Sequence, residues 1–406
     1  MTQPALTPVP ARPTPGATPS SPAAPAGTAS PDAAGGPRLA DLTTLRLGGP
    51  AGRYLETSSS VDLVDAVRGA DAAGEPLLVL GRGSNVVVPD EGFPGLVVRD
   101  VRTELTVEDA DTCGGASIVV PAGTPWVDVV DRAVAEGWVG VEALAGIPGS
   151  TGATPVQNVG AYGQEVSGVI ATVRVWDRQE SRIRTFTLGD LGFGYRTSVL
   201  KRSLRDEDGG PSRYAPTPRH VVLEVGLQLR LGTLSAPIGY TELANRLGVC
   251  VGGRAPLQEV RAAVLELRGR KGMLLDATDP DTWSAGSFFT NPVVAAGVAD
   301  GLPAGAPRFP VRSGRPERTT GPSLGRVDET LVKTSAAWLI ENAGFGKGFG
   351  LPGPVGLSTK HALALTHRGG GTTAELLDLA RTVRDGVRAT FGIVLEPEPV
   401  LVGCSL

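Results

Sequence analysis

The sequence predicts an α+β protein, and three observations support this fold class. The chain has 406 residues, which is enough for two or three domains with a sizeable apolar core. From about Leu39 onward, apolar runs typical of strands alternate with amphipathic segments that carry helix start and stop residues. Two glycine-dense segments interrupt this alternation. Because long loops in a compact domain are usually functional, we expect these segments to hold a ligand.

The first elements follow from caps and periodicity. SSSVDLVDAVRGADAAG, residues 58–74, places apolar side chains on one helix face between a serine cap and a closing glycine. PLLVLGRGSNVVVP, residues 76–89, is typical of a buried strand, a glycine turn and a second strand. TPWVDVVDRAVAEG, residues 124–137, predicts a short helix capped by Thr124, with Pro125 at the first helical position.

The later elements are predicted in the same way. VRVWD and RIRTFTL, residues 173–177 and 182–188, are typical of a strand hairpin. Three further segments have helical spacing, and the second of them begins after a cap at Thr334 or Ser335: residues 255–272, 336–344 and 371–392. The closing IVLEPEPVLVG has strand character, but its prolines indicate an edge or an irregular stretch.

Two segments differ from this pattern. Residues 1–38 are rich in Pro, Ala, Thr and Ser, and they lack the basic start and apolar centre of a signal peptide. Such a composition cannot bury enough apolar surface to offset chain entropy, so we expect a disordered tail. Residues 301–329, rich in Gly, Pro and Arg, are expected to form a flexible insertion.

Composition excludes several classes of protein. The formal net charge of -4 argues against a general binder of nucleic acid or anionic membranes, and no apolar run approaches the roughly 18 residues of a membrane span. The three cysteines form no CxxC pair, which favours a reducing compartment without a disulfide or zinc framework. His361 and His367 are six residues apart, a spacing that does not stack two metal ligands on one helix face. We therefore expect a cytoplasmic protein without a metal.

The glycine-dense segments point to a cofactor. LGRGSNVVV, residues 80–88, contains glycines that allow close backbone approach and an anion-binding nest of N–H groups. It is neither a Walker loop nor a dinucleotide fingerprint, and alone it indicates a tight turn. AGIPGSTGATPVQNVGAYG, residues 145–163, is a second such loop that also carries Gln157 and Asn158. Together the two loops predict a large cofactor with a pyrophosphate and a polar ring.

GSFFTNPVV places a single hydroxyl, that of Ser287, inside an apolar run. A buried serine is tolerated when its hydroxyl finds a partner, so one interpretation is an ordinary core residue. The other is that the hydroxyl faces a cavity and takes part in chemistry.

These segments closely resemble the UDP-N-acetylenolpyruvoylglucosamine reductases, flavoenzymes of bacterial peptidoglycan precursor synthesis. The resemblance extends from Thr43 to Leu401. It rests on seven motifs in order: TTLRLGGPA, VLGRGSNVVV, AGIPGSTGATPVQNVGAYG, FGYRTSVLK, GSFFTNPVV, AAWLIE and LEPEP. It implies an enzyme that uses NADPH and non-covalent FAD to reduce the enolpyruvyl ether of UDP-N-acetylglucosamine, UDP-N-acetyl-3-O-(1-carboxyvinyl)-glucosamine, to UDP-N-acetylmuramate. Such an enzyme serves cell wall biogenesis.

The resemblance also implies a domain plan. Two subdomains, residues 39–105 and 106–255, would form an FAD-binding fold of the vanillyl-alcohol-oxidase type. A substrate-binding α+β domain would follow at residues 256–395, and residues 396–406 would return to the active site as a C-terminal strand.

Site residues carry over by motif. Catalytic residues would be Arg196, Ser287 and Glu398, and the UDP-sugar would contact Tyr240, Lys271 and Asn291. Tyr240 in GYTEL matches the substrate-loop tyrosine of the family's first class. The chain departs from the family at Thr290, where a basic residue is common. FAD contacts would be Arg46, Gly81, Arg82, Gly83, Ser84, Asn85, Gly146, Ile147, Pro148, Gly149, Gly152, Ala153, Gln157, Asn158, Gly160, Ala161, Tyr162 and Gly163.

The chemistry suits these residue types. Hydride addition to an enolpyruvyl double bond delocalises negative charge into the substrate carboxylate, which the fixed fork of Arg196 can bind. The intermediate is a strong base, so the weakly acidic hydroxyl of Ser287 suffices as proton donor if it is well placed. Glu398 can approach the substrate carboxylate only if its pKa is raised or Arg196 balances its charge. Glu396 shares its strand face in a regular strand, so physical reasoning alone does not separate the two.

Two other interpretations remain open at this stage. An FAD-linked oxidase or dehydrogenase of the same fold often tethers its flavin through His or Cys, which neither glycine loop contains. A non-catalytic flavin- or nucleotide-binding module would not need the set Arg196, Ser287 and Glu398. We expect NADPH and a UDP-sugar as small-molecule partners, with no nucleic acid, membrane or protein partner.

Overall fold

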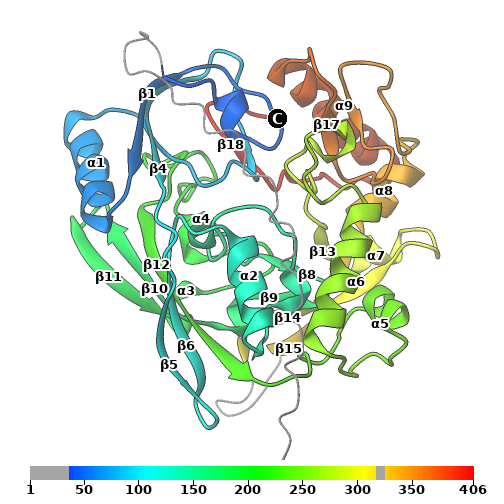
Figure 1. The fold of residues 1–406 in the computed structure, drawn as a ribbon. Coiled ribbons are helices and arrows are strands. Elements are labelled where there is room, and N and C mark those ends of the chain that lie inside the picture. Colours follow the sequence, from blue (N-terminus) through cyan, green and yellow to red (C-terminus); the bar gives the residue numbers. More distant parts are fainter. Residues whose placement is uncertain (1–35, 317–324) are drawn as a thin grey trace, which may run out of the picture. The chain divides into compact units, whose positions relative to one another are not determined.

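The computed structural model describes residues 36–316 and 325–406, so nearly all of the expected disordered tail lies outside the described residues. Helices and strands are intermixed along the chain, which confirms the α+β class (Figure 1). Within the described part, no helix is both long and apolar enough to cross a membrane.

The first sheet is parallel and contains β1 (Ala51–Thr57), β4 (Phe93–Asp100) and β2 (Leu77–Val79), in that order. Helix α1 (Ser60–Ala73) lies beside this sheet and buries one apolar face against it (Figure 1). The predicted caps at both helix ends are present. Ser59 accepts a hydrogen bond from the backbone N–H of Asp62 at the start, and Gly74 adopts the left-handed conformation at the end.

The glycine turn after β2 is followed by β3 (Val86–Val87), which does not pair with β2. It pairs instead, in parallel, with β18 (Val400–Leu401) at the end of the chain. This pairing brings the LEPEP segment beside the first glycine loop. The predicted irregularity of the C-terminal segment is confirmed, because β18 is its only strand and follows the prolines.

The second sheet is antiparallel and forms the largest core. Its order is β11 (Arg182–Thr187), β10 (Ile170–Asp177), β12 (His220–Leu231), β6 (Gly115–Pro121) and β5 (Thr106–Asp111), with β7 (Trp138–Val139) pairing to β12. The hairpin of β10 and β11 confirms the prediction. Helix α2 (Trp126–Ala135) buries Trp126 completely in this core.

The predicted cap of α2 is wrong. Pro125 occupies the cap position, whereas the Thr124 hydroxyl is buried without a hydrogen-bond partner in the described residues. The reason lies in local geometry: Pro125 has extended backbone angles, so the helix begins one residue later and Thr124 lies too far back to cap it.

Helices α5 (Thr241–Leu247) and α6 (Leu257–Arg270) also pack into the core of the second sheet. The apolar face of α6 therefore belongs with residues 106–255, although the helix follows the expected boundary. The sheets at residues 51–100 and 106–231 fit the two-subdomain plan. We propose that plan, with the third domain beginning after α6 rather than before it.

The remaining chain builds a separate core around α8 (Ala336–Asn342) and α9 (Thr373–Phe391). Ser335, not Thr334, caps α8, and α9 ends at Gly392 as predicted. Two small sheets accompany these helices, one of β16 and β17 and one of order β13-β15-β14. Their bounds are β13 Val293–Ala295, β14 Arg308–Pro316, β15 Gly325–Thr334, β16 Val355–Leu357 and β17 Leu365–His367, and α7 is Ala296–Asp300.

The expected flexible insertion at 301–329 requires correction. Strands β14 and β15 pair antiparallel through this segment, and β15 also pairs with β13. Because Gly, Pro and Arg are frequent in this segment, its strand character was not recognisable from the sequence. The pairing of β14 with β15 also contains register shifts, so it is not a regular ladder. Residues 317–324 lie outside the described residues.

The short elements that frame the site complete the fold. They are α3 (Leu188–Leu191), α4 (Val199–Arg202), β8 (Gly160–Ala161), β9 (Gln164–Glu165) and the 3₁₀ turns Leu39–Leu42, Glu142–Leu144, Thr151–Ala153, Val166–Gly168 and Pro280–Thr282.

Candidate active site

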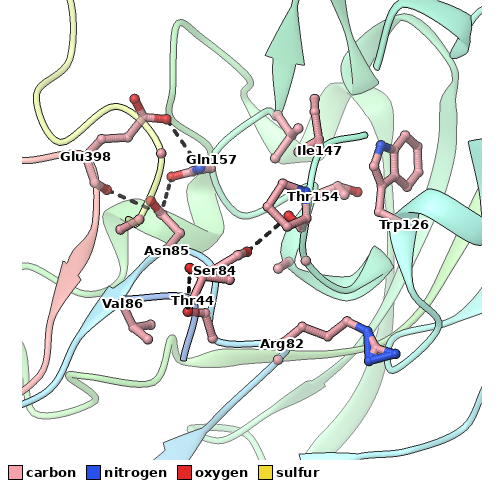
Figure 2. Close-up of a pocket in the computed structure, with 18 of the residues that line it drawn as sticks. Thr44, Arg82, Ser84, Asn85, Val86, Trp126, Ile147, Thr154, Gln157 and Glu398 are labelled. Atoms are coloured by element: carbon pink, nitrogen blue, oxygen red, sulfur yellow. Dashed lines mark hydrogen bonds between the residues drawn. The ribbon is translucent and has the colours of Figure 1, made fainter. Parts of the chain in front are cut away.

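A cavity of about 280 Å³ opens where the two glycine loops meet the C-terminal segment (Figure 2). It is lined by the turn after β2, by the second glycine loop, by the residues after α6, and by the segment that carries Ser287. Of the expected FAD contacts, the following line it: Gly81, Arg82, Gly83, Ser84, Asn85, Ile147, Pro148, Gly149, Ala153, Gln157, Gly160 and Ala161.

The two glycine loops are bound to each other at the cavity wall. The Ser84 hydroxyl donates to the main-chain oxygen of Pro148 at 3.1 Å, and Asn85 Nδ2 donates to Gln157 Oε1 at 2.8 Å (Figure 2). Two loops separated by more than 60 residues thus share one surface, as a large cofactor would require. The Ser84, Asn85 and Gln157 side chains therefore already use part of their hydrogen-bonding capacity in holding the two loops together.

The glycine at position 83 is required by close backbone approach. Its φ is 64°, and a Cβ there would lie 2.0 Å from the main-chain oxygen of Leu42. The backbone N–H of Thr44 donates to the Gly83 oxygen at 3.0 Å, which fixes the two segments together.

We expect Gly83→Ala to destabilise the fold and to lower the FAD content, because neither backbone segment can move away from the added methyl group. Gly74→Ala is the matched control, since Gly74 has a φ of 63° but open space around its Cβ position. That control should cost only about 1–2 kcal/mol in the free energy of unfolding. Urea unfolding and flavin absorbance of both variants measure the difference. Equal losses would contradict the clash.

Six expected cofactor contacts do not line the cavity. The Asn158 side chain is buried and bound to Glu165, to the oxygen of Gly194 and to the N–H of Ser167, so it holds the loop in shape. Arg46 has its guanidinium 3.9 Å from the ring centre of Trp283. The other four are Gly146, Gly152, Tyr162 and Gly163, and an FAD contact at any of these six positions stays a prediction.

Arg196 and Glu398 form an ion pair in the cavity wall. Arg196 Nε lies 3.2 Å from Glu398 Oε1, and the Arg196 Nη groups donate to the main-chain oxygens of Asn158 and Gly160 at 3.3 and 2.6 Å. Arg196 also has a φ of 53°, a conformation that non-glycine residues rarely adopt. The second glycine loop therefore positions the arginine, and the arginine positions the carboxylate.

Glu398 is held from several sides. Gln157 Nε2 donates to its carboxylate at 3.4 Å, and Lys201 Nζ donates to its main-chain oxygen at 3.3 Å. Burial raises the pKa of Glu398, while the charges of Arg196 and Lys201 oppose that rise. The sequence predicted a raised pKa or a tight partnership with Arg196, and the structure contains both.

The structure separates Glu398 from Glu396. The Glu396 side chain is 69% exposed and near only Arg205, whereas that of Glu398 is 14% exposed and faces the cavity. The intervening residue, Pro397, bridges to Phe289, and the segment is not a regular strand. The two glutamates therefore do not share one environment.

Ser287 lies on the segment that pairs with LEPEP. The N–H of Glu398 donates to the oxygen of Phe288 at 2.9 Å, which places the two motifs side by side. Phe288 and Phe289 are buried, while Ser287 lines the cavity. No residue that the structure describes forms a hydrogen bond with its hydroxyl, so this group is available to a bound molecule.

The expected UDP-sugar contacts lie apart from the cavity wall. The ring of Tyr240 meets that of Tyr162 edge-on at 5.4 Å, and Lys271 Nζ lies 5.8 Å from the Tyr162 ring centre and pairs with Glu242. Asn291 Oδ1 accepts from the N–H of Ala336, at the start of α8. Tyr240 and Lys271 thus belong to one cluster and Asn291 to another.

His361 lies near the first of these clusters, and its burial has a consequence for stability. Burial, reinforced by the charges of Lys271 and Lys347 and opposed by Glu242, lowers the pKa of His361 to about 4. Between that value and the unfolded value of about 6.5, the unfolded chain binds more protons than the folded chain. Burial of neutral His361 therefore has no proton-linked cost above pH 6.5. As the pH falls from 6.5 toward 4, the unfolded chain takes up a proton that the folded chain does not, and the free energy of unfolding decreases.

We expect His361→Gln to reduce this loss of stability. Urea unfolding of both proteins at pH 7.5 and pH 5 measures it. An unchanged difference between the two pH values would show that His361 does not titrate in this way.

Sequence reasoning missed two basic residues of the cavity wall, Lys201 and Arg268. Lys201 stands inside the motif FGYRTSVLK, five residues after Arg196, so the motif itself could have indicated it. Arg268 stands in the basic end of α6, where an arginine also suits the helix dipole, so its position in the sequence did not distinguish it from its basic neighbours.

Comparisons with known proteins identify the family of the chain. Residues 279–402 match the family model described as UDP-N-acetylenolpyruvoylglucosamine reductase, C-terminal domain, and residues 52–186 match an FAD binding domain. The chain is 49% identical to the UDP-N-acetylenolpyruvoylglucosamine reductase of Cutibacterium acnes, over 91% of this chain and 90% of that protein. It is 50% identical to that of Thermobifida fusca, over 91% and 97%.

A solved structure supports the same conclusion. The UDP-N-acetylenolpyruvylglucosamine reductase from Thermus caldophilus is 25% identical, with a TM-score of 0.55, over 90% of this chain and 97% of that one. The chain belongs to the UDP-N-acetylenolpyruvoylglucosamine reductase family, NADPH-dependent oxidoreductases that contain FAD.

Proposed function

We propose that the cavity reduces the enolpyruvyl ether of UDP-N-acetylglucosamine with Arg196, Ser287 and Glu398 as catalytic residues. One observation carries this proposal: the Arg196–Glu398 ion pair lines the same cavity as the Ser287 hydroxyl, which has no hydrogen-bond partner among the described residues. A charged fork and a free hydroxyl are what hydride and proton addition to a carboxylated alkene require.

The residues present fit FAD. A Cβ added at Gly81 would lie 2.5 Å from the hydroxyl of Ser150, another cavity-lining residue, so a glycine here leaves that hydroxyl in place and keeps the cavity wall open. Backbone N–H groups of residues 81–85 and of Gly149 and Ser150, which form no hydrogen bond within the described residues, would hold the pyrophosphate. When bound, FAD supplies the hydride that it has taken from NADPH. The protein's own residues then have to bind the substrate, stabilise charge and deliver a proton.

Arg196 would bind the substrate carboxylate and stabilise the negative charge that develops there. Its guanidinium is already oriented by two main-chain oxygens and by Glu398, so little reorganisation accompanies the reaction. A guanidinium keeps its charge at all working pH values, and its planar fork matches a carboxylate.

Ser287 would give its proton to the carbon next to the one that receives hydride. The buried rings of Phe288 and Phe289 keep bulk water away from the segment that carries it. In such a site the hydroxyl needs correct placement more than acidity.

Glu398 would help to orient the substrate carboxyl group and Arg196. Because it is paired with Arg196 and lies near Lys201, two cations face one carboxylate before substrate binds. The excess positive charge favours a second carboxylate, that of the substrate.

Finer assignments follow from the family. The UDP portion would extend toward the cluster of Tyr240 and Lys271, with Asn291 on its other side. NADPH would be the reductant in a cytoplasmic enzyme of peptidoglycan synthesis, with effects on cell shape and division. We propose no protein, nucleic-acid or membrane partner.

The test is a flavin redox cycle in the purified full-length protein. We expect a yellow protein that releases FAD without covalent attachment, is bleached by NADPH under anaerobic conditions, and regains its colour on addition of the enolpyruvyl UDP-sugar. UDP-N-acetylglucosamine, which lacks the alkene, is the control and should not restore colour. Recolouring by oxygen together with oxidation of a small alcohol would instead indicate an oxidase, and a flavin that NADPH does not bleach would indicate a binding module.

A further inference from the structure

Arg268 lies on the last turn of α6, where it lines the main cavity together with Gly272 and Met273. Its Nη2 donates to the main-chain oxygen of Met273 at 2.8 Å. Its Nε is fully buried and has no hydrogen-bond partner among the described residues. The guanidinium is thus only partly satisfied by the protein itself.

The charge of Arg268 is also uncompensated. No carboxylate in the described part of the chain forms an ion pair with it, and burial lowers its pKa to about 10. The cavity's other deeply placed cations differ, because Arg196 is paired with Glu398 and Lys201 lies near the same carboxylate. A buried cation without a counter-charge is unfavourable, and a bound anion removes that unfavourable term.

The second glycine loop packs against this guanidinium. Gly146 has a φ of 69°, and a Cβ there would collide with Leu265 and Leu274 and lie 3.5 Å from Arg268 Nε. A glycine at 146 therefore lets the loop close over the Nε side of the arginine. Arg268 itself lines the cavity, so its side chain borders the space that a bound molecule would occupy.

We infer that Arg268 is an anion-binding residue of the cavity, which supplies a charge-assisted hydrogen bond to an anionic oxygen group of its occupant. The inference rests on the proposed function for the identity of that occupant. The oxygen group belongs either to the cofactor or to the diphosphate of the UDP-sugar, and both are oxyanions that a guanidinium binds well.

The experiment compares Arg268→Met with Arg270→Met in the full-length holoenzyme. Arg270 is the matched control, because it is exposed on the same helix end and pairs only with Glu266. FAD affinity is measured by flavin fluorescence during serial dilution, and UDP affinity by titrating UDP against the flavin absorbance. Charged hydrogen bonds of this kind correspond to about 10- to 100-fold in affinity.

If the cofactor supplies the oxyanion, Arg268→Met should weaken FAD binding at least about tenfold. If the substrate supplies it, FAD binding should hold while UDP binding weakens by a similar factor. Arg268→Lys, which keeps the charge but not the fork, should lie between the wild type and Arg268→Met. Arg270→Met should leave both affinities unchanged.

Changes below twofold in both affinities for Arg268→Met would overturn the inference, as would equal losses in Arg270→Met. These outcomes do not depend on turnover. A protein that fails the NADPH and enolpyruvyl assay but loses FAD in Arg268→Met would refute the proposed function and leave the anion-binding role intact.

Discussion

Replacing Ser287 by alanine should lower kcat for the enolpyruvyl UDP-sugar at least about 100-fold, because general acid catalysis typically contributes 10²- to 10⁴-fold. Reduction of the flavin by NADPH should be unaffected, since the hydroxyl takes no part in that step. Stopped-flow absorbance separates the two half-reactions: bleaching by NADPH keeps its rate, and recolouring by substrate slows.

The small change in volume makes the variant informative. Ser287 lines the cavity and has no hydrogen-bond partner in the described residues, so its loss should leave the fold intact. Ser287→Cys is the matched variant, because a thiol is also a proton donor and should retain more activity than alanine. Full turnover in Ser287→Ala would refute the assigned acid.

Replacing Arg196 by lysine should lower kcat about 100-fold or more while FAD remains bound. One ammonium cannot reproduce the three contacts of the guanidinium, which reach Glu398 and the main-chain oxygens of Asn158 and Gly160. The remaining charge would still attract the substrate carboxylate, but without the fixed fork. Steady-state kinetics and the flavin content of the purified variant provide the measurement.

Arg205→Lys is the control, because Arg205 is exposed and lies 3.9 Å from the exposed Glu396. It should keep wild-type kinetics. Loss of FAD from Arg196→Lys would move Arg196 from the catalytic set to the cofactor site, since Gly160 lines the cavity beside the other expected FAD contacts.

Local signals in the sequence were reliable where short-range geometry decides the structure. The caps of α1, the end of α9 at Gly392 and the hairpin of β10 and β11 were all predicted, because each depends on residues within a few positions of one another. The cap of α2 failed because a proline shifted its start by one residue. The strands at 308–316 and 325–334 were missed because their pairing partners, not their own alternation, define them.

The residue types of the site were also readable from motifs. The motif match identified Ser287 as a candidate site residue, and the structure places this residue on the wall of a cavity. Lys201 was not predicted as a site residue, although it stands in a quoted motif. Arg268 was not predicted because its importance depends on the absence of a counter-charge near it in the folded protein. The absence of a counter-charge is a property of the folded environment.

By itself, the sequence determined the family, the glycine loops and the ends of α1, because these depend on residue identity and close spacing. Only the tertiary structure decided that Glu398 is buried beside Arg196 while Glu396 faces solvent. It also decided that Asn158 holds the loop rather than facing the cavity. The physical reason is that burial and ion pairing arise between segments far apart in the chain, such as those at 196 and 398. Their spacing in the sequence does not indicate that they come close together in space.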